Sequence, residues 1–151
     1  MDLGRSLLGG LAAAALLVAA CGTADLGTFE GVRDLKLDED FYYCAVQPQV
    51  ITPKRCAAGD SGDPSGGCHA SKSSMILVQI DAPVPCANGK PTRPPTTEER
   101  ANYQATQLRV TRDVESSPLL ARPTGQNHPR VVFGRTSPEA DVIRKWIQGA
   151  R

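Results

Sequence analysis

The sequence predicts a small, mostly α-helical domain with long Gly- and Pro-rich loops. Three segments show helical apolar periodicity, and the stretches between them hold half of the 14 Gly and nine of the 12 Pro among the 151 residues. With one Trp, three Tyr and three Phe, the core is thin. Domains of this size often need reinforcement from disulfides, a metal or a cofactor, and five cysteines and two histidines are available for it.

The first predicted helix begins at Asp38, which can cap it. Acidic residues in the first turn suit a helix start better than an acid/base pair. The apolar stripe consists of Phe41, Cys44 or Ala45, Val46, Val50 and Ile51. We expect Pro48 to interrupt this helix, and Lys54 and Arg55 to close it.

Two further helices are expected downstream. A capping box at Thr96–Glu99 starts one that runs to about Asp113 with a polar outer face. Its apolar positions are Ala101, Tyr103, Ala105, Leu108, Val110 and Val114. Ser137 caps the last helix, with Pro138 at its first position. Its core-facing stripe is Ala140, Ile143, Trp146, Ile147 and Ala150.

Four segments between the helices are expected to be non-helical. Residues 56–68 are Gly-rich and predict a flexible loop. Met75–Ile80 is short, apolar and rich in β-branched residues, which fits a strand or a buried extended segment. Pro83–Pro95 holds five prolines and predicts a surface loop pinned by Cys86, and Ser116–Arg130 predicts another loop.

The N-terminal sequence predicts an export signal. Arg5 precedes the uncharged apolar run Leu7–Ala20, which is short for a membrane span and suits a signal peptide. The run ends in Val-Ala-Ala-Cys21, which resembles the lipobox of bacterial lipoproteins. This resemblance implies that residues 1–20 are removed and that Cys21 carries a lipid. The alternatives are an ordinary Ala-x-Ala cleavage site and a short membrane anchor.

The domain boundaries follow from this signal. Residues 21–37 show no clear period and predict a tether, and residues 38–151 form the folded domain. The lipobox implies anchoring in the bacterial cell envelope. By the same resemblance, Gly22 in place of an Asp favours the periplasmic face of the outer membrane.

Four cysteines remain for the folded domain: Cys44, Cys56, Cys68 and Cys86. Thiols in an oxidising compartment are usually paired or modified, and four of them allow three disulfide connectivities. One hypothesis is two disulfides, Cys44 with Cys86 and Cys56 with Cys68. The pairing of Cys44 with Cys86 is also compatible with a cofactor held by the other two.

Cys68 is followed directly by His69, with Cys56 upstream. A covalent c-type haem needs two thiols and an adjacent His ligand to iron. The usual spacing is two residues, whereas residues 57–67 separate these cysteines. Closing the longer loop costs only roughly 1–2 kcal/mol more. The pattern therefore predicts haem attachment at Cys56 and Cys68, with His69 as the proximal ligand.

The flanking segments resemble bacterial cytochrome c domains of the planctomycete and myxobacterial type. Val46-Gln-Pro-Gln-Val-Ile51 with Lys54-Arg-Cys-Ala57 is similar to the helix that precedes haem attachment in that family. Gly125-Gln-Asn-His128 is similar to its Gly/His loop, and Ser137–Ala150 to its closing helix. The resemblance spans about Asp38 to Ala150 and implies a small cytochrome c-like fold, a single haem c and redox partner proteins.

The second axial ligand has two candidates, Met75 and His128. Met75 follows His69 by six residues, so the chain would have to pass around the cofactor's edge in a very short stretch. His128 has ample reach, and although the family more often uses a Met there, we predict His128 as the distal ligand. Bis-His ligation would lower the reduction potential.

Other functions find less support in the sequence. A formal charge of +1 argues against a nucleic-acid partner. The cysteines lack the paired short spacings of zinc sites, and two histidines give a Ser-His-Asp enzyme little basis. The sequence thus predicts a non-enzymatic, lipid-anchored, c-type cytochrome-like electron carrier. The alternative is a haem-free, disulfide-stabilised envelope lipoprotein that acts as an interaction module.

Overall fold

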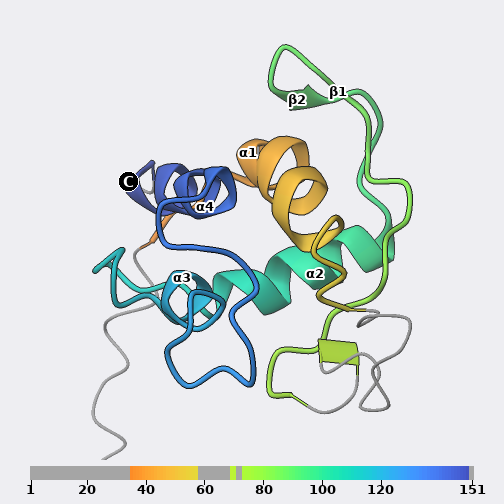
Figure 1. The fold of residues 1–151 in the computed structure, drawn as a ribbon. Coiled ribbons are helices and arrows are strands. Elements are labelled where there is room, and N and C mark those ends of the chain that lie inside the picture. The colour runs from red at the N-terminus through yellow and green to blue at the C-terminus, as the bar shows by residue number, and fades with distance from the viewer. Residues whose placement is uncertain (1–34, 58–68, 71–72, 150–151) are drawn as a thin grey trace, which may run out of the picture.

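The computed structural model describes residues 35–57, 69–70 and 73–149. The expected signal peptide, the lipid-bearing Cys21 and the haem-attaching Cys68 lie outside these residues. The regular secondary structure of the described residues is mostly helical, as predicted (Figure 1). Its elements are α1 (Glu39–Phe41), η1 (Tyr42–Ile51), β1 (Cys86–Ala87), β2 (Lys90–Pro91), α2 (Thr97–Gln107), α3 (Pro118–Ala121) and α4 (Pro138–Gln148). Within the described ranges, no helix combines the length and the apolar character that crossing a bilayer requires.

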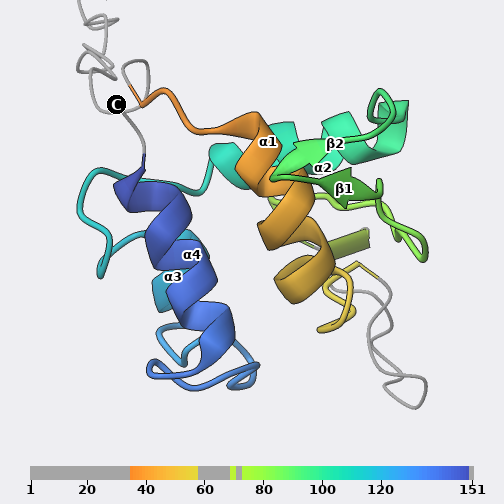
Figure 2. The same cartoon turned by 90° about the horizontal axis from the view of Figure 1, so that it is seen from above.

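The helices pack around the pair formed by η1 and α4. These two lie side by side in both views, and α3 lies against α4 (Figures 1 and 2). Helix α2 crosses beneath the η1 segment, which it contacts. Four aromatic rings fill the junction of η1, α2 and α4, with centroids 5.3–6.2 Å apart: Tyr42, Tyr43, Tyr103 and Trp146.

The first helix is not interrupted at Pro48. Asp38 caps it, because its carboxylate accepts a hydrogen bond from the Phe41 N–H at 3.0 Å. After α1 the helix widens to a π-helix, η1, which contains Pro48 and ends at Ile51. In an α-helix the Pro ring would clash with the carbonyl four residues earlier. In a π-helix the hydrogen bonds join residues five apart, so the carbonyl four residues earlier points in a different direction. The helix can therefore continue through Pro48.

Helix α2 has the predicted capping box at Thr96 and Glu99, but it ends at Gln107 rather than near Asp113. Its buried face also differs from the predicted apolar stripe, since Leu108 is 64% exposed. The buried side chains of α2 are mostly polar: Glu99, Asn102, Tyr103 and Thr106. They are buried because they hydrogen-bond to other elements or pair with charge, which compensates for lost hydration.

Helix α4 agrees with the sequence prediction, except that Ala150 of the predicted stripe lies outside the described residues. The Ser137 hydroxyl accepts a hydrogen bond from the Ala140 N–H at 3.3 Å, and Pro138 occupies the first turn. Its buried residues are Ala140, Ile143, Trp146 and Ile147. The Trp146 indole N–H donates to the Asp38 carbonyl at 2.8 Å, which ties this helix to the start of the first one.

Two stretches expected to be plain loops contain short elements. In residues 83–95 the strands β1 and β2 form an antiparallel hairpin. Its turn is Asn88-Gly89, and both residues have positive φ, as a type I′ turn requires. In residues 116–130, α3 buries Leu119, Leu120 and Ala121.

Two further segments complete the description. Met75–Ile80 forms no strand, and the predicted burial holds only for Leu77, since Ile76 and Val78 are exposed. At the expected end of the tether, Leu35 and Leu37 pack against the core. The packed part of the chain therefore begins before Asp38.

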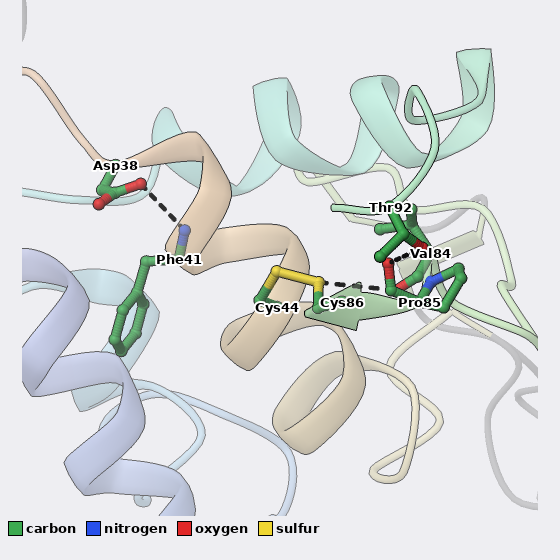
Figure 3. The surroundings of a disulfide bond; sticks show 7 residues. All are labelled: Asp38, Phe41, Cys44, Val84, Pro85, Cys86 and Thr92. Atoms are coloured by element: carbon green, nitrogen blue, oxygen red, sulfur yellow. Dashed lines mark hydrogen bonds between the residues drawn. A yellow bond between two sulfur atoms is a disulfide. The ribbon is translucent and has the colours of Figure 1, made fainter. Parts of the chain in front are cut away.

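A disulfide joins η1 to the hairpin. Cys44 on η1 is bonded to Cys86 on β1, with Cα atoms 5.7 Å apart (Figure 3). The hairpin base is held further by Thr92, whose N–H donates to the Pro85 carbonyl at 2.8 Å. The bond encloses a long loop that includes His69 and the extended segment 75–80, so it limits how far that loop can move from η1.

Candidate functional site

The structure brings His69 and His128 together from two loops far apart in sequence. Their ring centroids are 6.2 Å apart and the ring planes differ by 21°. Both side chains are half-buried. The two histidines that the sequence analysis selected as axial ligands are therefore spatial neighbours.

Backbone carbonyls fix the tautomer of both rings. His69 Nδ1 lies 3.1 Å from the Met75 carbonyl oxygen, and His128 Nδ1 lies 2.6 Å from that of Arg130. A carbonyl oxygen only accepts, so in each neutral ring Nδ1 carries the proton and Nε2 carries the lone pair. Metal-ligating histidines commonly show this arrangement, in which the second nitrogen donates to a backbone carbonyl.

The environment of His69 favours the neutral ring. Desolvation by burial lowers the pKa of its imidazole, and the neighbouring His128 and Arg109 lower it further, against the opposing effect of the Met75 hydrogen bond. Ser73 adds a second contact, with its Oγ 2.8 Å from His69 Nδ1. A neutral, oriented imidazole is the form that binds metals.

The segment after His69 is anchored by side chains rather than by a sheet. The Leu77 N–H donates to the His69 carbonyl at 2.7 Å. The fully buried Asn102 amide then accepts from the Val78 N–H at 2.7 Å and donates to the Val78 carbonyl at 2.8 Å. The network continues from Asn102 to Gln47 and Tyr42 on η1. These contacts hold the histidine-bearing loop against η1 and α2.

Two adjoining cavities meet at the histidine pair. They have volumes of about 250 Å³ and about 240 Å³, and both are lined by His69, Met75 and His128. Apolar residues form most of the wall of the larger cavity: Val50, Ile51, Leu119, Pro123, Val132, Phe133 and Ile143. This lining suits a bulky, largely apolar ligand.

Cys56 lies on the wall of the larger cavity. Its thiol is not in a disulfide, and desolvation by burial raises its pKa to about 11, although Arg130 and Lys54 oppose this shift. The thiol is thus neutral at physiological pH. The cavity accordingly brings together three residues predicted for haem binding: Cys56, His69 and His128.

Met75, the other candidate for the distal ligand, lines both cavities. Its backbone carbonyl accepts the hydrogen bond from His69. In this structure its contact with His69 is thus through the main chain, and it orients that ring. Among the described residues, no group of three His, Cys, Asp or Glu side chains is arranged to hold a metal ion.

Cationic side chains surround the cavities. Lys54, Arg55 and Arg130 line the larger one, and Arg109 and Arg122 line the smaller one. None of the described Asp and Glu residues lines either cavity. The sequence analysis missed this basic rim, because its members come from three separate segments. It also missed Ser73 and Asn102, although Ser73 lies only four residues after His69.

Comparisons with protein-family models, with curated proteins and with solved structures gave no match to this chain. The function therefore has to be argued from the site itself.

Proposed function

We propose that the protein is a c-type cytochrome-like electron carrier, anchored by lipid at Cys21, that holds one haem between His69 and His128. The observation that carries the proposal is the histidine pair with its spacing and its fixed tautomers. Two imidazoles that bind one metal ion from opposite sides through bonds of about 2 Å have ring centroids roughly 6 Å apart. In the structure the two rings are nearly parallel, at 21°, with centroids 6.2 Å apart, a spacing that leaves room for one metal ion between them.

The donor set and the cavity walls also fit a haem. The predicted attachment residues are Cys56 and Cys68, and the neutral Cys56 thiol lies on the cavity wall. Addition of a thiol S–H across a vinyl C=C gives a thioether and leaves no atom over. When bound, a haem iron supplies reversible one-electron transfer.

The surrounding residues have identifiable roles in such a carrier. The carbonyls of Met75 and Arg130 hold the Nδ1 protons of the two ligands and so keep the Nε2 lone pairs available. Apolar side chains such as Leu119 and Phe133 line the cavity and would shield a bound haem from water. Ligands held in place in this way would move little when a bound haem gains or loses an electron.

The test is expression of the mature domain together with haem-maturation proteins. We expect a red protein with a sharp α-band on reduction and haem that stays attached in a denaturing gel. Cys56→Ser should lower the amount of covalently held haem. A colourless protein would refute the proposal, and one in which Cys56 is bonded to Cys68 would favour the haem-free interaction module instead.

The ligand role of His128 is tested separately. His128→Gly should convert the spectrum to that of an iron with one His ligand, and added imidazole should restore it. The matched control is Gln126→Gly, which alters an exposed neighbour in the same loop. If His128→Gly leaves the spectrum unchanged, His128 is not a ligand.

The lipid anchor has its own test. In a bacterial host, the full-length chain should incorporate labelled palmitate and fractionate with the outer membrane. Cys21→Ser should abolish both. Labelling that persists in Cys21→Ser would refute the lipobox assignment without bearing on the haem.

A further inference from the structure

Part of the apolar stripe predicted for α2 lies on the surface. Ala101, Ala105 and Leu108 follow one another at helical spacing, so they share one face of the helix. Leu108 is 64% exposed, Ala101 is also exposed, and Ala105 is only partly buried. The core takes up the polar face of α2 instead, which leaves most of this stripe facing outward in the described part of the chain.

A second row of apolar side chains lies beside the stripe. The extended segment is tied to α2 at two points, because Asn102 pairs with the backbone of Val78 and the Arg109 guanidinium donates to the Ser74 carbonyl. The segment therefore runs along the helix in the opposite direction. On this segment Ile76 is 49% exposed and Val78 is 41% exposed. The two rows form one surface, the apolar patch: Ile76, Val78, Ala101, Ala105 and Leu108.

The patch gathers most of the exposed apolar bulk of the described residues. Ile76, Val78 and Leu108 are three of the four large apolar side chains that are exposed there, and Val131 is the fourth. Single exposed apolar residues are ordinary, whereas a contiguous group marks an interaction surface. A second copy of the chain is a poor fit, because stable interfaces use roughly 20–30 residues on each side and the patch has far fewer.

The lipid anchor brings another surface within reach. Residues 22–34 separate the proposed anchor at Cys21 from Leu35, the first described residue. A chain of this length spans at most about 50 Å. The chain then passes α2, because the Leu37 carbonyl accepts a hydrogen bond from the Tyr103 hydroxyl at 3.4 Å. The helix that carries the patch is thus held close to the bilayer, and this raises the effective concentration of membrane around it.

We infer that the apolar patch docks onto the surface of the bilayer to which the chain is tethered. This inference rests on the lipid anchor of the proposed function, but not on its haem. The large side chains Ile76, Val78 and Leu108 enter the boundary between headgroups and acyl chains and lose their contact with water. Three side chains bind a membrane weakly, and the tether makes the weak contact effective.

Docking sets the direction in which the histidine site faces. Ile76 directly follows Met75, whose carbonyl oxygen lies 3.1 Å from His69 Nδ1. Ser74 and Arg109, which join the extended segment to α2, also line the smaller cavity. With the patch on the bilayer, this cavity lies beside the membrane surface. An undocked domain would instead turn freely at the end of its tether.

The test uses the full-length, lipidated chain in its bacterial host. The photoreactive amino acid p-benzoylphenylalanine replaces Leu108 in one protein and Val131 in the other. Val131 is the matched control, because it is also 64% exposed and lies outside the patch. Cells are grown with radioactive phosphate and illuminated. The label that stays on the purified protein in a denaturing gel then measures crosslinked phospholipid.

We expect strong phospholipid crosslinking from position 108 and little from position 131. Combining the probe at 108 with Ile76→Gln and Val78→Gln should lower the crosslinking about tenfold, because burial of large apolar side chains drives the contact. Equal crosslinking from positions 108 and 131, or none from either, would overturn the inference. A crosslink from position 108 to a second copy or to another protein would also overturn it.

Vesicle flotation measures the affinity of the patch itself. The mature chain with Cys21→Ser has no lipid of its own, and the probe is vesicles of phosphatidylethanolamine and phosphatidylglycerol. Leu108→Gln should reduce the fraction of protein that floats with the vesicles, and Val131→Gln should not. Equal flotation of these two variants would count against the patch.

Failure of the patch is distinguishable from failure of the proposed function. A chain that incorporates labelled palmitate but crosslinks equally from both positions refutes only the docking. A chain that incorporates no palmitate refutes the anchor. Neither readout depends on the haem.

Discussion

Asn102 should contribute strongly to the free energy of unfolding. Its side-chain amide makes the two backbone hydrogen bonds that a neighbouring strand would otherwise make. It is fully buried on α2 and pairs with both the N–H and the carbonyl of Val78. It also donates to Gln47 Oε1 at 3.4 Å. Asn102→Ala removes all three hydrogen bonds and leaves a small cavity. With roughly 1 kcal/mol for each good hydrogen bond and a further contribution from the unpaired buried groups, we expect a loss of about 2–4 kcal/mol.

The assay is urea denaturation of the haem-free domain with its disulfide intact. Asn102→Ala should lower the midpoint without a large change in slope. Gln104→Ala is the matched control on the exposed side of the same helix and should stay within about 0.5 kcal/mol of wild type. In Asn102→Ala the amide of Leu77 should also exchange faster, because it bonds to the His69 carbonyl next to the released segment. A loss below about 1 kcal/mol with unchanged exchange at Leu77 would refute the role assigned to Asn102.

Three further predictions concern other parts of the domain. Replacing Cys44 and Cys86 by Ala should cost about 4 kcal/mol in denaturant unfolding, from the entropy of a loop with a sequence separation of 42; a loss under 1 kcal/mol would contradict this. Hydrogen bonds, the strongest of them from Lys54, lower the pKa of the Glu139 carboxyl to about 2. The ionised carboxylate therefore stabilises the fold fully above the unfolded pKa near 4.3, and this stabilisation is lost as pH falls toward 2. Glu139→Gln should therefore flatten the acid limb of a stability-versus-pH curve, and an unchanged limb would rule the pair out as its cause. Burial raises the pKa of Cys56 to about 11, so in the haem-free native domain iodoacetamide at pH 8 should label it slowly, and much faster in urea; equal rates would show that the thiol is accessible.

Local signals predicted the starts of the helices well. The caps at Asp38, Thr96 and Ser137 depend on side chains only three residues from the N–H they bind, so a short stretch of sequence contains both partners. The hairpin was also within reach, because Asn88-Gly89 is a strong type I′ signal. The five prolines of that stretch favour a loop, however, because proline cannot donate a hydrogen bond to a strand ladder.

The buried face of α2 could not be predicted in the same way. Apolar periodicity favours Leu108 as a core residue and leaves Asn102 outside. Asn102 is buried only because Val78 and Gln47, far away in sequence, offer matching donors and acceptors. A polar residue becomes a core residue when a distant segment satisfies it, and periodicity contains no information about that segment.

In the site, too, the sequence indicated which types of residue are involved, but not how the fold places them. Chemistry singled out His69 and His128 because few other side chains could ligate iron, and the fold brings their rings to 6.2 Å. The basic rim had no such signal, because its members lie far apart in the sequence and a net charge of +1 does not show which charges share a surface. Net charge argued against a polyanionic ligand for the chain as a whole. An electrostatic role depends instead on which charges share a surface within a Debye length of about 8–10 Å, and that arrangement is a property of the fold.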